Sequence, residues 1–286
     1  MTKHLLILAG GASSRMKAST AVEGLSSAEI EAANQVSKAL IEFGPDKRPI
    51  LDFLLRSAEK AGFTHIILIV GTPYDRFQFY YGNQTSGNRY GKLSISYAIQ
   101  HIPEGRAKPF GTADAVLQAM EQYPYLKEVS FCVCNCDNLY SPAALRALVT
   151  TSAKNAFIAY DREGLLHSED RIARFALAVL DQENNLEGII EKPESHEIEA
   201  YRDSEGKLRV SMNIFKFHGP EMYPYLRDCP PHPNRDEKEL PTAILLFCED
   251  HPFHFNGIPF HEHVPDLTSK EDIPIMKQYI KTHFGD

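Results

Sequence analysis

The stretch HLLILAGGASSRMK, residues 4–17, joins a short apolar run directly to a turn of small residues. The run Leu5–Ala9 is continuously apolar, which is typical of a parallel strand buried on both faces. Gly10 and Gly11 permit a sharp turn and a close approach of a ligand to main-chain N–H groups. Arg15 adds a fixed positive charge suited to phosphate oxygens. A strand followed by such a turn indicates a phosphate-binding loop, although the glycines alone suit an ordinary tight turn equally well.

The loop matches neither of the two best-known phosphate motifs. The chain has no Walker A pattern, which needs four residues between two glycines and then Lys-Ser/Thr. Gly10 and Gly11 are adjacent, and no third glycine follows at the offset of the dinucleotide fingerprint. The loop therefore predicts a phosphate cradle of another kind.

The composition is that of an ordinary globular protein of 286 residues, with 43% hydrophobic residues and a formal net charge of −8. No apolar run reaches the ~18 residues that span a bilayer, and the first strand is too short for a secretory signal. We therefore expect a cytoplasmic protein with no membrane partner. The acidic balance argues against nucleic acid as a partner, and an anionic substrate would need a local cluster of Arg and Lys. A homo-oligomer is left open.

Three of the five cysteines, Cys132, Cys134 and Cys136, alternate in the stretch FCVCNCD. On a strand they share one face, with neighbours about 6.6 Å apart, which is two strand rises. That spacing is too wide for sulfurs that each lie ~2.3 Å from one zinc ion. The pattern therefore predicts buried, reduced thiols, as expected in the cytoplasm.

Strand-like runs and helical patterns alternate along the chain. The strand-like runs are Leu5–Ala9, His65–Val70, Leu93–Ala98, Val129–Cys134, Ala156–Tyr160, Phe175–Leu180 and Val210–Phe217. One helix is expected to end at Gly62, another to begin at Gly111-Thr112, and a third to be capped by Ser141. The alternation predicts an α/β protein with a mostly parallel sheet and helices on both faces. Ligands of such sheets bind beyond the carboxyl ends of the strands.

Two segments interrupt this alternation. Ser26–Gly44 reads as an amphipathic helix, in which Ser26 and Glu29 have capping-box spacing. We interpret it as a surface helix packed on the sheet; a lid or subunit contact near the phosphates is the alternative. Residues 228–241 are rich in proline and charge, which predicts an exposed connection before a terminal section.

A second polar loop, VCNCDNLYSP, follows another buried strand. Asp137 stands where that strand ends and before a capped helix begins. A carboxylate at the carboxyl end of a strand is well placed to hold a hard cation beside a phosphate. Alone, such a residue is more often simply part of a turn or a helix entry.

Six motifs occur in the order found in the nucleotidyltransferases that make nucleotide sugars: LAGGASSRM, DKRPILDFLLRSAEKAGF, GTADAV, CNCDNLY, IIEKP and DLTSKEDI. The chain resembles this family over nearly its whole length. The resemblance implies a Rossmann-like, GT-A-like fold in one domain, 1–286, with a nucleotide-binding part at about 1–140, an acceptor-binding part at about 141–235 and a C-terminal section at about 236–286. It also implies Mg²⁺-dependent transfer of a nucleotidyl group from an NTP to a sugar-1-phosphate-type acceptor, with release of pyrophosphate.

The resemblance assigns roles to individual residues. It implies nucleotide contacts for Ala9, Gly10, Gly11, Gln100, Gly111 and Thr112. Arg15 and Lys47 would neutralise charge at the reacting phosphates, and Lys192 of IIEKP would hold the acceptor phosphate. Asp137 and Asp266 would be the two carboxylates that bind Mg²⁺.

Two departures from the family pattern keep other functions open. Ser13-Ser14 resembles the loop of molybdenum-cofactor guanylyltransferases, but there Asp-Lys follows at once, whereas here Asp46-Lys47 comes after the inserted segment. Thr268 stands where the late family motif usually has glycine. A guanylyltransferase-like enzyme that acts on another phosphate acceptor is therefore one alternative. A non-catalytic nucleotide-binding regulator and a metal-dependent phosphate hydrolase are the others.

Overall fold

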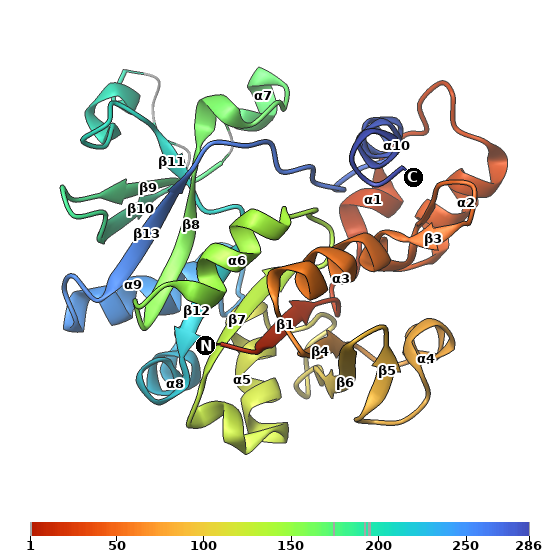
Figure 1. The fold of residues 1–286 in the computed structure, drawn as a ribbon, viewed down its shortest axis with the longest axis horizontal. Helices are drawn as coiled ribbons and strands as arrows, with labels where there is room; N and C mark the ends of the chain where they lie inside the picture. Colours follow the sequence, from red (N-terminus) through yellow and green to blue (C-terminus); the bar gives the residue numbers. More distant parts are fainter. Residues whose placement is uncertain (1, 174, 192, 194–195, 286) are drawn as a thin grey trace.

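The computed structural model describes residues 2–173, 175–191, 193 and 196–285. In this part of the chain, one 11-stranded sheet has the order β10-β9-β11-β8-β12-β7-β1-β4-β6-β5, with β13 paired to β8 (Figure 1). Its strands are β1 His4–Leu8, β4 His65–Val70, β5 Asn88–Tyr90, β6 Leu93–Ile99, β7 Ser130–Asn135, β8 Asn155–Asp161, β9 Leu177–Leu180, β10 Leu186–Ile190, β11 Arg209–Val210, β12 Ile214–His218 and β13 Phe255–Phe260. A small separate hairpin pairs β2, Glu42–Phe43, with β3, Arg48–Pro49.

Helices cover both faces of the sheet, as the alternating pattern predicts (Figure 1). They are α1 Ser14–Ala18, α2 Ser27–Gln35, α3 Ile50–Ala61, α4 Asp75–Tyr81, α5 Thr112–Gln122, α6 Pro142–Thr150, α7 Glu169–Ile172, α8 Gly219–Asp228, α9 Leu240–Asp250 and α10 Asp272–His283. Short 3₁₀ turns are η1 Lys38–Leu40, η2 Pro124–Lys127, η3 Arg162–Gly164 and η4 Ile198–Tyr201. Buried side chains of α3, α6 and α10 form one core, and those of α5, α8 and α9 form the other.

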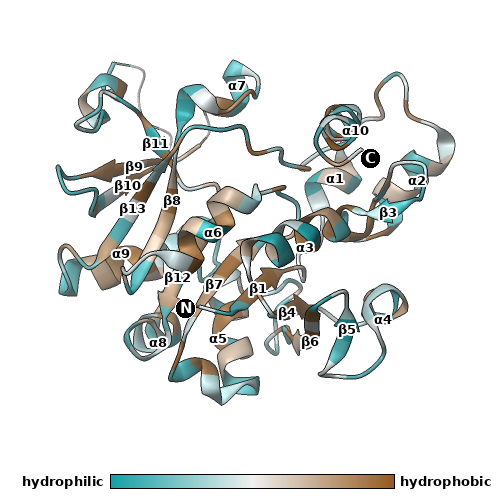
Figure 2. Ribbon diagram, in the orientation of Figure 1, coloured by the Kyte–Doolittle hydropathy of each residue, from teal (hydrophilic) through white to brown (hydrophobic). Residues whose placement is uncertain are grey.

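The central strands are parallel and apolar on both faces. β1 pairs in parallel with β4 on one side and with β7 on the other, and β4 pairs in parallel with β6. Leu5, Leu6 and Ile7 have no exposed surface, because each face of β1 contacts one of the two cores. Beyond β7 the sheet is largely antiparallel, apart from the β8–β13 pair. The apolar strands lie inside, and the helices turn polar faces outward (Figure 2).

Local signals at the helix ends are confirmed. α3 is followed by Gly62 at φ +104°, a left-handed position that favours glycine. The Ser141 hydroxyl accepts the N–H of Ala144 at 3.0 Å and caps α6. Ser26 and Glu29 form the capping box at the start of α2.

The helix predicted over Ser26–Gly44 is wrong in its second half. α2 ends at Gln35, and the chain continues through η1 into β2. Val36, directly after α2, has an extended backbone with φ −100° and ψ 161°, so the helix ends there. Further on, the Ile41 carbonyl accepts the N–H of Ile50 at 2.9 Å beside the β2–β3 hairpin.

The strand predicted over Val210–Phe217 is also wrong in one respect. It is divided into β11 and β12 by a bend in which Met212 and Asn213 have φ of +45° and +56°. The hydroxyl of Tyr140 donates to the Met212 carbonyl at 2.8 Å and holds this bend. The interruption places Met212 and Asn213 in the wall of the cavity described below.

The cysteine prediction is confirmed. Cys132, Cys134 and Cys136 are buried and free, as is Cys229, whereas Cys248 is free and half-buried. Burial raises the pKa of the Cys132 thiol to about 12, so this thiol stays protonated at neutral pH.

Candidate functional site

A cavity of about 740 Å³ opens at the carboxyl ends of β1 and β7. Leu8 and Asn135, the last residues of these two strands, form part of its wall. Four residues singled out from the sequence also line it: Arg15, Thr112, Asp137 and Asp266. The cavity lies where a parallel sheet is expected to bind its ligand.

The loop after β1 carries free main-chain donors. The N–H of Ala9 donates to the Ile69 carbonyl at 2.8 Å and extends the pairing of β1 with β4. Within the described residues, the N–H groups of Gly10, Gly11 and Ala12 make no hydrogen bond. A Cβ on Gly10 would lie 3.3 Å from both the Gly71 nitrogen and the Gln100 side-chain oxygen. The backbone is therefore packed closely on one side and has unbonded donors suited to phosphate oxygens.

The short helix α1, which carries Arg15, is fastened at both ends. Before it, Ser13 has φ +54°, and its hydroxyl accepts the N–H of Lys38 at 3.2 Å. After it, the buried ammonium of Lys270 donates to the carbonyls of Met16 at 2.9 Å and Ser19 at 2.6 Å. These contacts fix the position from which the exposed Arg15 side chain reaches the cavity wall.

Asp137 is paired with Lys38. The Lys38 ammonium forms a hydrogen bond and ion pair with the Asp137 carboxylate, and both side chains are largely buried. Burial alone would lower the pKa of Lys38, but the Asp137 charge and hydrogen bond more than offset that effect and raise it. Lys38 is therefore a fixed cation in the cavity region.

Asp266 lies beside Asp137 although the two are remote in sequence. The Leu267 N–H donates to the Asp137 carbonyl at 2.9 Å, and the Leu139 N–H donates to the Pro265 carbonyl at 3.1 Å. The late motif and the strand-end loop therefore meet through backbone hydrogen bonds. Both carboxylates line the same cavity.

The Asp266 carboxylate has partners of its own. The Arg171 guanidinium contacts it at 2.5 Å, and the Thr268 hydroxyl donates to it at 2.9 Å. Burial and the nearby Asp137 charge raise the pKa of Asp266, and Arg171 and Lys38 only partly counter this. The Asp137 charge thus disfavours ionisation of Asp266, which a further cation between the two carboxylates would relieve.

Gln100 and Gly111, which the sequence predicts to contact the nucleotide, are hydrogen-bonded to each other. The buried Gln100 amide donates to the Gly111 carbonyl at 2.9 Å and to the Asp114 carboxylate at 3.0 Å. Gly111 has φ +105°, and a Cβ there would lie 2.3 Å from the Lys238 carbonyl oxygen. The Thr112 hydroxyl accepts the N–H of Leu240 at 3.0 Å.

The segment 228–241 does more than connect two parts of the chain. It packs on Gly111, and Arg235, Glu237 and Glu239 line the cavity. Arg235 is ion-paired with Glu191 at 2.7 Å and Glu239 at 2.6 Å. The composition of this segment indicated its exposure, but gave no signal that it forms a cavity wall.

Lys47, which the sequence predicts at the reacting phosphates, is not among the residues that line this cavity. Lys47 lies in the turn between β2 and β3 at φ +49° and lines a different, larger cavity. Its role at the reacting phosphates stays a prediction. Lys192 lies outside the described residues, so its role in holding the acceptor also stays a prediction.

Sequence reasoning missed Lys38 and Arg171. Lys38 had a weak local signal, because it directly precedes the buried run Ala39-Leu40-Ile41 just before the DKRPILDF motif. Arg171 lies in α7 without any motif around it. Its partners Asp266 and Asp272 are about a hundred residues away, so no local pattern could have identified it.

Comparison with known proteins agrees with this geometry. A family model described as nucleotidyl transferase matches residues 5–239. The chain belongs to the nucleotidyl transferase family. Its fold is similar to that of a UDP-glucose pyrophosphorylase solved in complex with UDP-glucose, with 15% sequence identity, a TM-score of 0.69, and coverage of 99% of this chain and 100% of that one. A search of curated protein sequences finds no match.

The resemblance inferred from the motifs is therefore confirmed, and so is the Rossmann-like nucleotidyltransferase fold. The protein is a nucleotidyltransferase. Among its described residues, no helix is both long and apolar enough to cross a membrane.

Proposed function

We propose that this nucleotidyltransferase transfers the nucleotidyl group of an NTP to the phosphate of a sugar-1-phosphate-type acceptor and releases pyrophosphate, with Mg²⁺ as cofactor. The observation that carries the proposal is the meeting of Asp137 and Asp266 beside the loop after β1. That loop supplies unbonded N–H groups, and Arg15 adds a positive charge on the same cavity. The UDP-glucose bound to the structurally similar pyrophosphorylase supports a sugar phosphate as the acceptor.

The donor set fits Mg²⁺. The ion prefers oxygen ligands and is commonly held by one or two carboxylates, with water and phosphate oxygens completing the shell. Asp137 and Asp266 are such carboxylates, and burial together with the Asp137 charge raises the pKa of Asp266. When bound there, Mg²⁺ would neutralise and orient phosphate oxygens.

The reaction needs no covalent enzyme intermediate. An oxygen of the acceptor phosphate attacks the α-phosphorus, and the bond from that phosphorus to the pyrophosphate oxygen breaks. Two anions must meet, so the work of the protein is positioning and charge stabilisation. The N–H groups of Gly10 and Gly11 and the Arg15 guanidinium would hold the triphosphate, and Lys38 would offset charge close to Asp137.

The test is a matrix of the four NTPs against a panel of sugar 1-phosphates, with and without Mg²⁺, read as pyrophosphate release and nucleotide-sugar formation in equal amounts. We expect one nucleotide and one acceptor to give turnover that a chelator abolishes. Pyrophosphate or phosphate release from an NTP without acceptor would favour a hydrolase. Nucleotide binding without any turnover would favour a regulator. Turnover only with GTP and an acceptor other than a sugar phosphate would favour the guanylyltransferase alternative.

A further inference from the structure

A second cavity is larger than the one at the strand ends. It has a volume of about 1360 Å³ and lies between α2, the β2–β3 hairpin, α4 and α10. In Figure 1 these elements lie together at the right of the molecule. Asp137 and Asp266 are not among its lining residues. A volume of this size accommodates an organic molecule as large as a typical cofactor.

The floor of this cavity is apolar. Leu40, Phe43, Phe53 and Ile280 line it and are almost fully buried. At the rim, Phe79 of α4 is 83% exposed, although a phenyl ring of this size is costly to leave in water. The cavity therefore has an apolar interior and a solvent-exposed aromatic side chain at its edge.

The rim is basic although the chain as a whole is acidic. Six basic and four acidic side chains line the cavity, in a protein of net charge −8. All four acidic groups already have partners: Glu29 pairs with Lys277, Glu31 with Gln35, Glu42 with Tyr80 and Asp46 with Arg48. Across the described residues, no ion pair or hydrogen bond engages the side chains of Arg56, Arg76 or Lys281.

These cations stand beside the apolar groups. Arg76 and Phe79 are three residues apart on α4, and Lys281 follows Ile280 on α10. Residues three apart on a helix lie on the same face. A ligand with an apolar body in the cavity would thus have a cation, Arg76 or Lys281, within reach of an anionic group at the rim.

Two elements connect this cavity to the site at the strand ends. In η1, Leu40 lines the large cavity, whereas Lys38 contacts Asp137. In α10, Ile280 and Lys281 line the large cavity, and Asp272 at the first turn accepts the N–H groups of Thr268 and Ser269 next to Asp266. A ligand that packs on Leu40 and Ile280 therefore contacts the elements that hold the candidate catalytic groups.

We propose that this cavity is a second binding site, for a small amphipathic organic anion, meaning a phosphate, sulfonate or carboxylate on an aromatic or aliphatic body. Its occupancy orders η1 and α10 and so acts on the position of Lys38. The site is separate from the one that would bind the NTP and the acceptor, and its existence does not depend on the function proposed above.

The probe is anilinonaphthalene sulfonate, which combines an aromatic body with a single negative charge and fluoresces when it leaves water. We expect one probe molecule to bind per chain. The double variant Arg76→Ala/Lys281→Ala should weaken its binding at least tenfold. The matched control Arg89→Ala/Lys92→Ala removes two exposed cations that do not line the cavity and should leave affinity within twofold of wild type. The uncharged analogue phenylnaphthylamine should bind both double variants equally.

Hydrogen exchange measured with and without saturating probe tests the connection to η1. We expect slower exchange in residues 36–43 and 272–284 of the wild type, and no such change in Arg76→Ala/Lys281→Ala. The proposal is overturned by non-saturable binding, by equal weakening in the control variant, or by unchanged exchange in both segments. Sedimentation showing that a second copy of the chain fills the cavity and excludes the probe would also overturn it. Pyrophosphate release is not part of this readout, so failure here and failure of the proposed function are distinguishable.

Discussion

At the scale of single residues, Lys38 and Lys47 are the two candidates for the lysine that would neutralise charge at the reacting phosphates. Lys38 touches Asp137, whereas Lys47 lines the other cavity. We expect Lys38→Ala and Arg15→Ala each to reduce kcat by ~10²–10³, the usual loss when one stabilising donor is removed, and Lys47→Ala to cost less than Lys38→Ala. Steady-state kinetics on variants with unchanged circular dichroism would measure this. A larger loss in Lys47→Ala would restore the role predicted for it from the sequence.

The two carboxylates are tested by isosteric substitution. Asp137→Asn and Asp266→Asn keep size and remove charge, so they test ligation more than packing. We expect the first to abolish turnover and the second to reduce it severely, with half-maximal activity moved to higher Mg²⁺. Titration of Mg²⁺ at saturating substrates measures the shift. Wild-type Mg²⁺ dependence in Asp266→Asn would restrict the metal site to Asp137.

At the scale of elements, Lys270 ties the late motif to the helix that carries Arg15. Its ammonium is almost fully buried and donates to three carbonyls at the end of α1. Lys270→Met keeps much of the length and removes these bonds, so we expect a stability loss of about 1–3 kcal/mol and a fall in kcat through misplacement of Arg15.

A double-mutant cycle separates this positioning effect from general destabilisation. If Lys270 acts through Arg15, the kcat of Arg15→Ala/Lys270→Met should be close to that of Arg15→Ala alone, because interacting residues are non-additive. Losses in kcat that multiply would instead show that Lys270 acts independently of Arg15. The measurement uses kcat and KM for both substrates at a temperature where all variants are folded.

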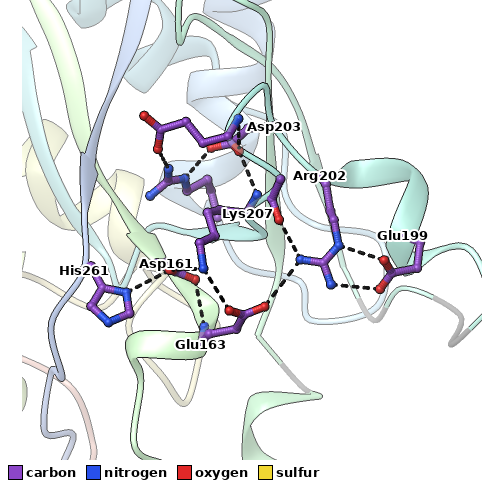
Figure 3. A network of polar contacts seen from close by, with 10 residues as sticks. Asp161, Glu163, Glu199, Arg202, Asp203, Lys207 and His261 are labelled. Atoms are coloured by element: carbon purple, nitrogen blue, oxygen red, sulfur yellow. Dashed lines mark hydrogen bonds and ion pairs between the residues drawn. The ribbon is translucent and has the colours of Figure 1, made fainter.

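A second element-scale contact clamps β11 to the turn that follows η4. Arg209 is almost fully buried and contacts the buried Asp203 at 2.6 Å. Around this pair, Lys207 contacts Asp161 at 3.2 Å and Glu163 at 2.9 Å, and Arg202 contacts Glu199 at 2.7 Å (Figure 3). Burial would raise the pKa of Asp203, but the Lys207 N–H and the Arg209 guanidinium overcome it and lower that pKa.

The lowered pKa fixes the sign of the pH dependence. A carboxyl whose pKa is lower in the folded state stabilises the fold above its unfolded pKa of about 3.9, and this stabilisation is lost as the pH falls through the folded value. We expect Asp203→Asn to cost about 3 kcal/mol at neutral pH and the difference from wild type to shrink below about pH 4. Denaturant unfolding at several pH values measures it; a constant difference down to acid would contradict the assignment.

The sequence predicts the helix ends that depend on interactions within a few residues of the chain. Gly62 ends α3 and Ser141 caps α6 because glycine tolerates positive φ and a serine hydroxyl satisfies a free N–H. The predicted end of the strand before Asp137 also located this residue at the edge of the sheet where ligands are expected to bind. Contacts between remote segments had no such signal: Lys38 meets Asp137 across 99 residues, and Arg171 meets Asp266 across 95. The bend at Met212 depends on Tyr140, which is also remote in sequence.

At the scale of the whole molecule, the parts proposed for the nucleotide and the acceptor share one sheet. β7 pairs with β12 over five residue pairs, from Ile214 opposite Cys134 to His218 opposite Ser130. Both cores also contain residues from each part, so neither part has a core of its own. Leu8 of β1, Phe215 of β12 and Arg235 of the segment 228–241 line one cavity, so a ligand there would contact all three elements.

This continuity predicts one cooperative unfolding transition for the whole chain. A nucleotide that binds only the folded state stabilises it by about 2.7 kcal/mol at a hundred times Kd, and this gain should move the entire transition. Calorimetry and far-ultraviolet circular dichroism should give the same midpoint with and without Mg²⁺ and the preferred NTP. Asp137→Asn should lose the Mg²⁺-dependent part of the upward shift. Two separate transitions, only one of them moved by nucleotide, would mean instead that the β7–β12 pairing does not couple the two parts.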